Sequence, residues 1–261
     1  MSAPGSTAPV LYDVDGRVAT FTLNRPDQRN AVDPGLAAAL GDAVARFEAD
    51  PEVWVGILTG AGANFCAGAD LKAMAAGLSV DMATPEGGFG GWVRYPRTKP
   101  VIAAVRGFAL AGGTELVLAC DLVVAAEDAT FGLPEVTRGI VAAAGGLFRL
   151  PRAIPPARAR ELVLTGDRLG APEAHRLGLV NRLVPADDVL TEARALADRI
   201  CQNAPVAVRE SLAVLRAAAE LTEDEAWARS ADAMQRARQS EDAKEGPRAF
   251  AQKRPPRWTG R

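Results

Sequence analysis

The sequence contains few cysteines and almost no histidine, which narrows the chemistry open to it. Three cysteines and one histidine occur among its 261 residues. Because Cys66, Cys120 and Cys201 lie far apart and form no C-x-x-C pair, a zinc site of Cys and His ligands is not expected. A Ser-His-Asp triad would have to use His175, and no G-x-S-x-G turn is present. The sequence therefore predicts a protein without a bound metal or resident cofactor, in a reducing compartment.

An excess of either charge and a long hydrophobic run are also absent. Lysine and arginine number 30 and aspartate and glutamate 32, so the net charge is −2. This balance argues against a groove that follows nucleic-acid phosphates. No apolar run approaches the ~20 residues of a membrane span, and residues 1–9 lack the basic and apolar regions of a signal peptide. We expect a cytoplasmic protein that binds neither nucleic acid nor membrane, with disorder over residues 1–9.

What is present is an ordinary globular composition with alternating strand and helix patterns. Hydrophobic residues make up 48% of the chain, and a chain this long buries enough surface to fold without disulfides. Asp33 before Pro34 marks the start of a helix whose apolar residues recur at helical spacing as far as Phe47. Short runs rich in apolar and β-branched residues predict strands over residues 18–23, 53–59, 101–105 and 122–126.

Turns made of small residues follow two of these strands. Residues 60–69 form a loop rich in glycine and alanine, and residues 109–113 lead into a helix predicted over residues 114–119. A strand, a glycine-rich turn and a helix therefore recur along the chain. This order favours an α/β fold in which helical crossovers join parallel strands, although no repeat of fixed period is visible in the residues themselves.

The C-terminal part of the chain has a different composition. From about Ala186 the sequence is rich in alanine and in charged residues, with helix boundaries predicted at residues 204–205 and 221–222. Helices of this composition need a surface to pack against, which is either the rest of the chain or another subunit.

Two turns offer backbone N–H groups to a ligand. Residues 65–71, Phe-Cys-Ala-Gly-Ala-Asp-Leu, form a tight turn of small residues that a ligand can approach. Gly112 and Gly113 open a helix, so the free N–H groups of its first turn are accessible and favour negative charge; Glu115 follows in the same turn. Taken alone, each feature is explained at least as well by an ordinary loop or an ordinary helix start.

A second carboxylate follows a rigid turn. In residues 131–135, Phe-Gly-Leu-Pro-Glu, Pro134 stiffens the chain and orients Glu135. Taken alone, this glutamate is typical of a solvated loop. Two such turns and two such carboxylates do not by themselves establish an active site.

The order of these features along the chain resembles the enoyl-CoA hydratase/isomerase (crotonase) superfamily. The resemblance runs from about residue 10 to residue 261. Each segment is common by itself, but all of them in this order are specific. The segments are Leu23-Asn24-Arg25-Pro26, Asn30-Ala31, residues 65–71, 99–105, 107–121, 131–135 and 164–167, Ala174, Gly178-Leu179-Val180, Ala249-Phe250 and Lys253-Arg254.

The resemblance implies a fold and an assembly. It implies a crotonase-like α/β core over residues 10–190, built as a spiral of repeated β-β-α units. Residues 191–261 would form a C-terminal helical region used for trimerisation, so that the chain assembles as a homotrimer or a dimer of trimers.

The resemblance also implies a substrate and a site. Members bind acyl-CoA thioesters, so coenzyme A enters as part of the substrate. The motifs match Ala69 and Gly112 to the two backbone N–H groups of an oxyanion hole, and Glu115 and Glu135 to two glutamates that flank a water molecule in the hydratases. Glu115 would activate or orient that water, and Glu135 would protonate Cα. The implied reaction is hydration of trans-2-enoyl-CoA to 3-hydroxyacyl-CoA in fatty-acid and acyl-CoA breakdown.

Contacts with coenzyme A are implied near both ends of the chain. For the cations among these residues, a solvated basic surface is an equally good interpretation. The matching residues are Arg25, Ala67, Asp70, Leu71, Lys72, Phe250 and Lys253, of which Phe250 and Lys253 would reach a neighbouring subunit's adenine and phosphate.

Several residues depart from the family's common pattern or leave their role open. Residues 139–149 replace a more polar, proline-containing version and would reshape the floor of the acyl site. Cys66 has no evident paired base, so we do not expect it to act as a nucleophile. His175, near a helix end, is expected to have no catalytic role. Trp92 and Tyr95 either pack in the interior or line the acyl pocket.

Other functions remain open beside hydration. A double-bond isomerase, an acyl-CoA hydrolase or a decarboxylase of crotonase type would keep the same backbone donors and use the two acids differently. A non-catalytic acyl-CoA binding protein would bind the thioester without turnover.

Overall fold

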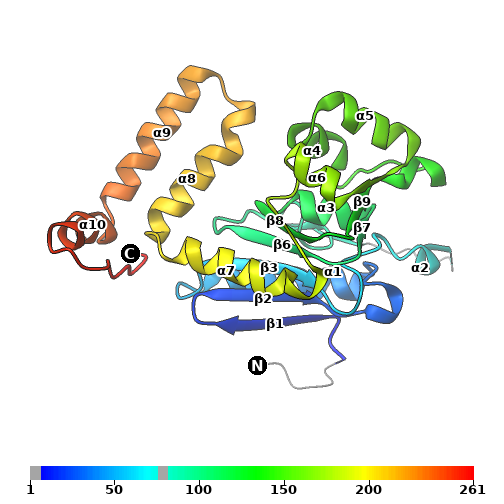
Figure 1. Cartoon of the computed structure of the whole chain (residues 1–261), viewed down its shortest axis with the longest axis horizontal. Coiled ribbons are helices and arrows are strands. Elements are labelled where there is room, and N and C mark those ends of the chain that lie inside the picture. Colours follow the sequence, from blue (N-terminus) through cyan, green and yellow to red (C-terminus); the bar gives the residue numbers. More distant parts are fainter. Residues whose placement is uncertain (1–6, 76–81) are drawn as a thin grey trace.

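The fold is built on a main sheet whose strands run mostly parallel. The computed structural model describes residues 7–75 and 82–261 (Figure 1). The strand order in this sheet is β1-β2-β3-β6-β8-β11, with β1 and β2 antiparallel and the other pairs parallel. The strands are β1 (Val10–Asp15), β2 (Val18–Leu23), β3 (Val55–Gly60), β6 (Val101–Val105), β8 (Leu122–Ala126) and β11 (Arg182–Val184).

The N-terminal hairpin forms because its loop suits a tight turn. Only Gly16 and Arg17 separate β1 from β2, and Gly16 adopts a φ of +58°, which glycine tolerates without strain. Before β1, the Asn24 backbone N–H donates to the Pro9 carbonyl at 2.8 Å. Of the residues 1–9 predicted to be disordered, residues 7–9 are therefore held next to the hairpin, and residues 1–6 lie outside the described residues.

Two consecutive β-β-α units generate the rest of the core. After β6, the chain forms β7 (Phe108–Leu110) and α3 (Gly112–Leu118). After β8, it forms β9 (Thr130–Gly132) and continues to α4 (Gly146–Ala153). In each unit the first strand joins the main sheet, and the second joins a smaller sheet of order β10-β9-β7, in which β10 is Arg168–Gly170.

The segment after β3 follows the same plan. Cys66 forms a parallel bridge with Ala109 of β7, and the chain then enters α2 (Leu71–Ala75). The units therefore repeat the same course of the backbone but carry different side chains. This arrangement confirms the predicted crotonase-like spiral and the α/β class.

The local predictions hold with small shifts at element ends. The helix expected after Asp33 is α1 (Pro34–Ala49), and the Asp33 side chain accepts a hydrogen bond from the Leu36 N–H at 2.8 Å. The strand expected over residues 53–59 is β3, which begins two residues later. The helix expected over residues 114–119 begins at Gly112, because Ala111 takes a φ of +50° and ends the preceding turn.

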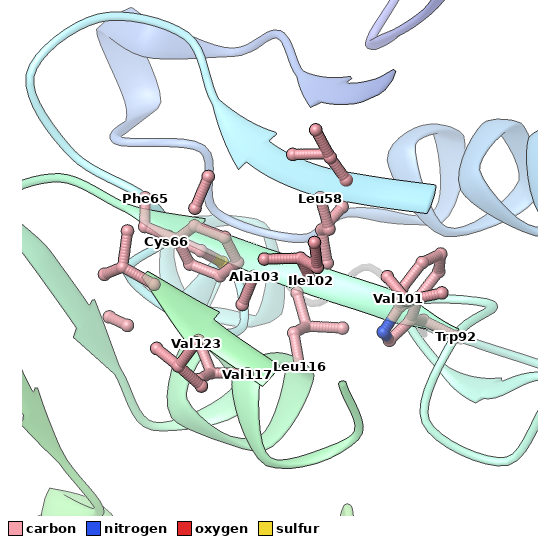
Figure 2. Close-up of a cluster of buried hydrophobic side chains, with 14 of the residues drawn as sticks. Leu58, Phe65, Cys66, Trp92, Val101, Ile102, Ala103, Leu116, Val117 and Val123 are labelled. Carbon is pink, nitrogen blue, oxygen red and sulfur yellow. The ribbon is translucent and has the colours of Figure 1, made fainter. Parts of the chain in front are cut away.

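The buried core holds α3 firmly against the main sheet. In Figure 2, Val101, Ile102 and Ala103 of β6 lie among side chains from β3, β8 and α3. Leu116 and Val117 of α3 are completely buried there. Because these two residues directly follow Glu115, the packing of the core fixes where that glutamate lies.

Trp92 belongs to this interior. Its side chain is completely buried, and its ring meets Phe21 edge-on with centroids 5.3 Å apart. Phe21 in turn meets Phe47 of α1 at 5.4 Å. Of the two roles left open for Trp92, the structure therefore assigns packing.

The C-terminal helices extend away from the core as a hairpin (Figure 1). They are α8 (Pro205–Ala217), α9 (Glu223–Arg238) and α10 (Asp242–Ala251), preceded by α7 (Val189–Cys201) on the main sheet. Both predicted boundaries are confirmed, since Ala204 precedes α8 and Thr222 caps α9 in a capping box with Glu225. Within the described parts of the chain, no helix combines the length and apolar character that crossing a membrane would require.

The hairpin leaves apolar side chains uncovered. Leu215 is 72% exposed and Trp227 is 69% exposed. Such residues are the surface that Ala-rich helices offer to a partner. Trimer assembly through this region stays a prediction.

Candidate active site

A large cavity lies where α3, the turn after β9 and α4 face one another. Its volume is about 1290 Å³. Ala69, Gly112, Glu115 and Glu135, four residues far apart in the sequence, all line it. Residues 139–149, which depart from the family's common pattern and were expected to shape the acyl site, also line this cavity. Those that line the cavity are Ile140, Val141, Ala143, Ala144, Gly145, Phe148 and Arg149.

Backbone contacts bring the Ala69 and Gly112 segments together. The Leu110 N–H donates to the Cys66 carbonyl at 3.0 Å, and the Cys66 N–H donates to the Phe108 carbonyl at 3.1 Å. Gly68 has a φ of +91°, and a Cβ added to it would lie 3.0 Å from the Gly112 nitrogen. Only glycine therefore allows the two segments to approach this closely.

Two backbone donors are left without partners at this contact. Within residues 7–75 and 82–261, neither the Ala69 N–H nor the Gly112 N–H donates a hydrogen bond to the protein. Ala111, immediately before Gly112, is held at a φ of +50° by its N–H bond of 2.8 Å to the Gly132 carbonyl. Both residues line the same cavity, and two free backbone N–H groups are the donors that a developing oxyanion would need.

Glu115 is buried and held by backbone donors. Its side chain is 3% exposed, and Oε1 accepts a hydrogen bond from the Gly146 N–H at 2.9 Å. Burial raises the pKa of this carboxyl, while the Gly146 and Ala144 N–H groups and the charge of Arg149 act against that rise. These donors stabilise the ionised form of Glu115.

Glu135 is buried without comparable support. It lies in the short 3₁₀ helix Pro134–Arg138 and is 7% exposed. Its Oε2 has no hydrogen-bond partner within the described residues. Burial raises the pKa of Glu135 to about 7, its own backbone N–H opposes the rise, and the nearby Glu115 charge adds to it. Burial therefore raises the pKa of both carboxyl groups in the cavity, and backbone N–H groups of other residues and an arginine charge oppose that rise only at Glu115.

Arg149 is a site residue that motif matching did not single out. Its Nη2 donates to the Val93 carbonyl at 2.7 Å, and its guanidinium carbon lies 5.4 Å from the Phe148 ring centre. From there its positive charge acts on Glu115. In the sequence, Arg149 was notable only as the charged last residue of segment 139–149, which is otherwise apolar and departs from the family's common pattern.

The predicted coenzyme A residues near the N-terminal half have different surroundings. Ala67 and Leu71 line the cavity, and Lys72 is exposed on α2 beside them. Arg25 does not line the cavity. Its Nη2 pairs with Asp70 at 3.1 Å and with Asp33 at the same distance.

These ion pairs give Arg25 a supporting position behind residues 67–71. The Arg25 side chain is 18% exposed, and its Nη1 also donates to the Ala31 carbonyl. Its charge is used within the fold, where it anchors Asp70 and so the turn that carries the Ala69 N–H.

The other predicted coenzyme A residues lie far from this cavity in the same chain. Phe250 on α10 is 87% exposed, and Lys253 follows the end of that helix. In Figure 1, α10 lies at the end of the molecule opposite α4 and α5 (Pro156–Thr165). A contact of these residues with substrate would therefore have to be made in another subunit, as the resemblance implies.

Cys66 and His175 have structural surroundings. Cys66 is completely buried, and burial raises the pKa of its thiol to about 12. His175 Nδ1 lies 2.8 Å from the Val180 carbonyl and does not line the cavity. Neither residue is placed to react with a ligand there.

Known proteins resemble the chain over nearly its whole length. A carnitinyl-CoA dehydratase from Proteus mirabilis is 44% identical over 252 residues, covering 94% of this chain and 96% of the relative. The crystal structure of an enoyl-CoA hydratase from Mycobacterium marinum is 48% identical with a TM-score of 0.93, covering 97% of this chain and 100% of that one. That of a carnitinyl-CoA hydratase from Mycobacterium avium is 46% identical with a TM-score of 0.77, covering 98% and 100%.

A family model decides the assignment. The model described as enoyl-CoA hydratase/isomerase matches residues 13–261. With the spiral of β-β-α units, this match shows that the chain belongs to the enoyl-CoA hydratase/isomerase family of the crotonase superfamily.

Proposed function

We propose that this protein is a hydro-lyase that adds water across the Cα=Cβ bond of a trans-2-enoyl-CoA to give 3-hydroxyacyl-CoA. One observation carries the proposal. One cavity is lined by two backbone N–H groups that have no partner among the described residues and by two buried carboxyl groups with different surroundings. The names of the relatives, which are hydratases and dehydratases, support the same reaction type.

The backbone donors would polarise the thioester. In the proposed reaction, the carbonyl oxygen accepts hydrogen bonds from the Ala69 and Gly112 N–H groups. Electron density drawn onto that oxygen makes Cβ electrophilic and stabilises the enolate-like state. A preorganised donor of this kind is typically worth about 3 kcal/mol of the barrier.

The two carboxyl groups would transfer the protons. Glu115, whose Oε1 accepts the Gly146 N–H, would act in its ionised form, orienting a water molecule and taking its proton as the oxygen bonds to Cβ. Glu135, with its pKa raised to about 7, donates its proton to Cα. One proton leaves water and one reaches carbon, so the reaction is a net hydration. Each transfer typically contributes a factor of about 10² to 10⁴ in rate.

Binding of the coenzyme A portion is part of the proposal. Ala67, Leu71 and Lys72 lie beside the oxyanion donors and would receive its pantetheine and phosphate groups. Phe250 and Lys253 of an adjacent subunit in a homotrimer or dimer of trimers would complete the site. The exposed apolar surface of the C-terminal helices supports such an assembly.

The reaction is tested by following the conjugated thioester. Enzyme is mixed with crotonyl-CoA and longer trans-2-enoyl-CoAs, and the loss of conjugated-thioester absorbance is recorded. Products formed in H₂¹⁸O are analysed by mass, because hydration places one labelled oxygen on the acyl chain. Release of free coenzyme A, loss of CO₂ or a shifted double bond would instead indicate a hydrolase, a decarboxylase or an isomerase. Binding without turnover at any chain length would overturn the hydratase.

A further inference from the structure

A second hollow lies next to the catalytic cavity and is lined by arginines. Its volume is about 530 Å³. Its lining includes five arginines but only two carboxylates, so its charge is strongly positive. The arginines are Arg94, Arg97, Arg149, Arg152 and Arg216, and the carboxylates are Asp121 and Glu220.

The carboxylates present are already engaged. Asp121 accepts two hydrogen bonds from Arg216, at 2.8 and 2.7 Å. Glu220, at the tip of the α8–α9 hairpin, pairs with Arg152 of α4 at 3.1 Å. Three arginines of the hollow therefore have no carboxylate partner within the described residues.

These three arginines retain unused donors. Arg94 is exposed, and its guanidinium makes no hydrogen bond or ion pair within the described part of the chain. Arg97 donates to the Trp92 and Ala119 carbonyls, but its buried Nε has no partner. Leaving a buried donor unpaired and crowding like charges both cost stability. An anion in the hollow would relieve both costs.

The hollow adjoins the cavity, because five residues line both. Residues common to both linings are Val93, Arg94, Phe148, Arg149 and Glu220. Of these, Arg149 is the cation that acts on Glu115. Ala67, Ala69 and Leu71, on the thioester and coenzyme A side, line the cavity but not the hollow. An acyl chain that extends from the oxyanion donors past Glu115 to Phe148 and Arg149 would therefore reach the arginines.

We propose that this hollow binds a carboxylate at the far end of the substrate's acyl chain, so that the preferred substrates are ω-carboxy-2-enoyl-CoA thioesters. This inference rests on the proposed function and specifies its substrate class. By the same electrostatics, an acyl chain ending in a quaternary ammonium, as in a carnitine-derived thioester, is disfavoured. The polar donors and the charge of the hollow exclude a purely alkyl tail as the best fit.

The preference is tested with tails that differ in charge alone. Values of kcat/KM are measured for ω-carboxy-2-enoyl-CoAs of increasing length, for their methyl esters and for 4-trimethylammoniobut-2-enoyl-CoA. At the length that reaches the hollow, we expect the acid to exceed its ester by about tenfold. The quaternary ammonium substrate is expected to be the poorest. An acid-to-ester ratio near one at every length, or a preference for the cation, would overturn the proposal.

Two variants test whether the preference for the acid over its ester arises in the hollow. Arg94→Gln removes the arginine without a described partner and should lower the acid-to-ester ratio severalfold. Arg160→Gln removes an exposed arginine that lines neither the cavity nor the hollow, and should leave the ratio as it is. If Arg94→Gln weakens the acid and the ester equally, the hollow binds a phosphate of coenzyme A and the proposal is wrong.

Binding measurements separate this inference from the reaction itself. Saturated ω-carboxyacyl-CoAs and their methyl esters cannot be hydrated, so calorimetry with these ligands reports on the tail alone. Tighter binding of the acid supports the arginine site even if no enoyl-CoA is turned over. Equal binding of the two ligands, together with normal hydration of crotonyl-CoA, would reject the site and leave the hydratase standing.

Discussion

The raised pKa of Glu135 predicts how activity and stability respond to pH. In the proposed reaction this side chain must be protonated to donate to Cα, and its pKa is raised to about 7. Above that pH, kcat for hydration should fall about tenfold for each pH unit, because the protonated fraction falls by that factor. Stopped-flow absorbance with saturating crotonyl-CoA from pH 6 to pH 9 measures this limb. A kcat that stays constant over this range would refute the assignment of Glu135 as the acid.

The same pKa has a consequence for folding. Burial favours the neutral carboxyl in the native state, whereas the unfolded chain ionises near the ordinary value of 4.5. Burial of Glu135 therefore does not lower the free energy of unfolding below pH 4.5. That free energy falls as the unfolded chain ionises above pH 4.5, and the loss is complete once the pH has risen through 7. The displacement from 4.5 to about 7 corresponds to a loss of about 3 kcal/mol.

Glu135→Gln isolates this loss, because an amide does not titrate. We expect the variant to gain about 3 kcal/mol relative to the unmodified protein between acidic pH and pH 8, while its kcat falls by about 10² to 10⁴. Urea unfolding at pH 5, 6, 7 and 8, followed by tryptophan fluorescence, measures the difference. Glu223→Gln, which removes an exposed carboxyl in the first turn of α9, is the control. A difference that does not change with pH would contradict the buried, neutral state of Glu135.

Three further substitutions test the other parts of the site. Glu115→Gln should lower kcat by about 10² to 10⁴ with little change in KM, measured by steady-state kinetics, and an unchanged kcat would remove Glu115 from the mechanism. Gly112→Ala places a Cβ 2.4 Å from an aromatic ring beside the oxyanion donor and should lower kcat/KM at least about 100-fold. Gly170→Ala, whose added Cβ would meet only an atom 3.9 Å away, should retain activity, and equal losses in these two glycine variants would count against the oxyanion role. Arg25→Gln removes both of its ion pairs and should lower the unfolding free energy by about 1 to 3 kcal/mol in a urea titration, with a higher KM; normal stability would show that these pairs contribute nothing.

The sequence was sufficient to predict elements whose signals are local. Asp33 before Pro34 defines the start of α1, since a cap and a fixed φ act within one turn. The boundaries of α8 and α9 follow from Pro205 and from the capping residue Thr222 for the same reason. The order of short motifs indicated the family, and the family model and solved structures confirm it.

The β-β-α repeat could not be seen in the residues. Its units share a backbone path, with one strand in the main sheet and one in the smaller sheet, but they place different side chains along it. A spiral of this kind needs only apolar residues at strand positions and small residues at its turns. Many sequences meet that requirement, so no fixed period results.

Charge at the site was decided by the tertiary structure alone. Local sequence shows a glutamate after Pro134, but only packing buries it beside Glu115, leaves its Oε2 without a partner among the described residues and raises its pKa. Arg25 was expected to bind phosphate, yet the fold surrounds it with Asp33 and Asp70. The physical reason is the range of the forces involved. Capping and turn geometry act over a few residues of chain, whereas burial and electrostatic interaction depend on neighbours that only folding brings together.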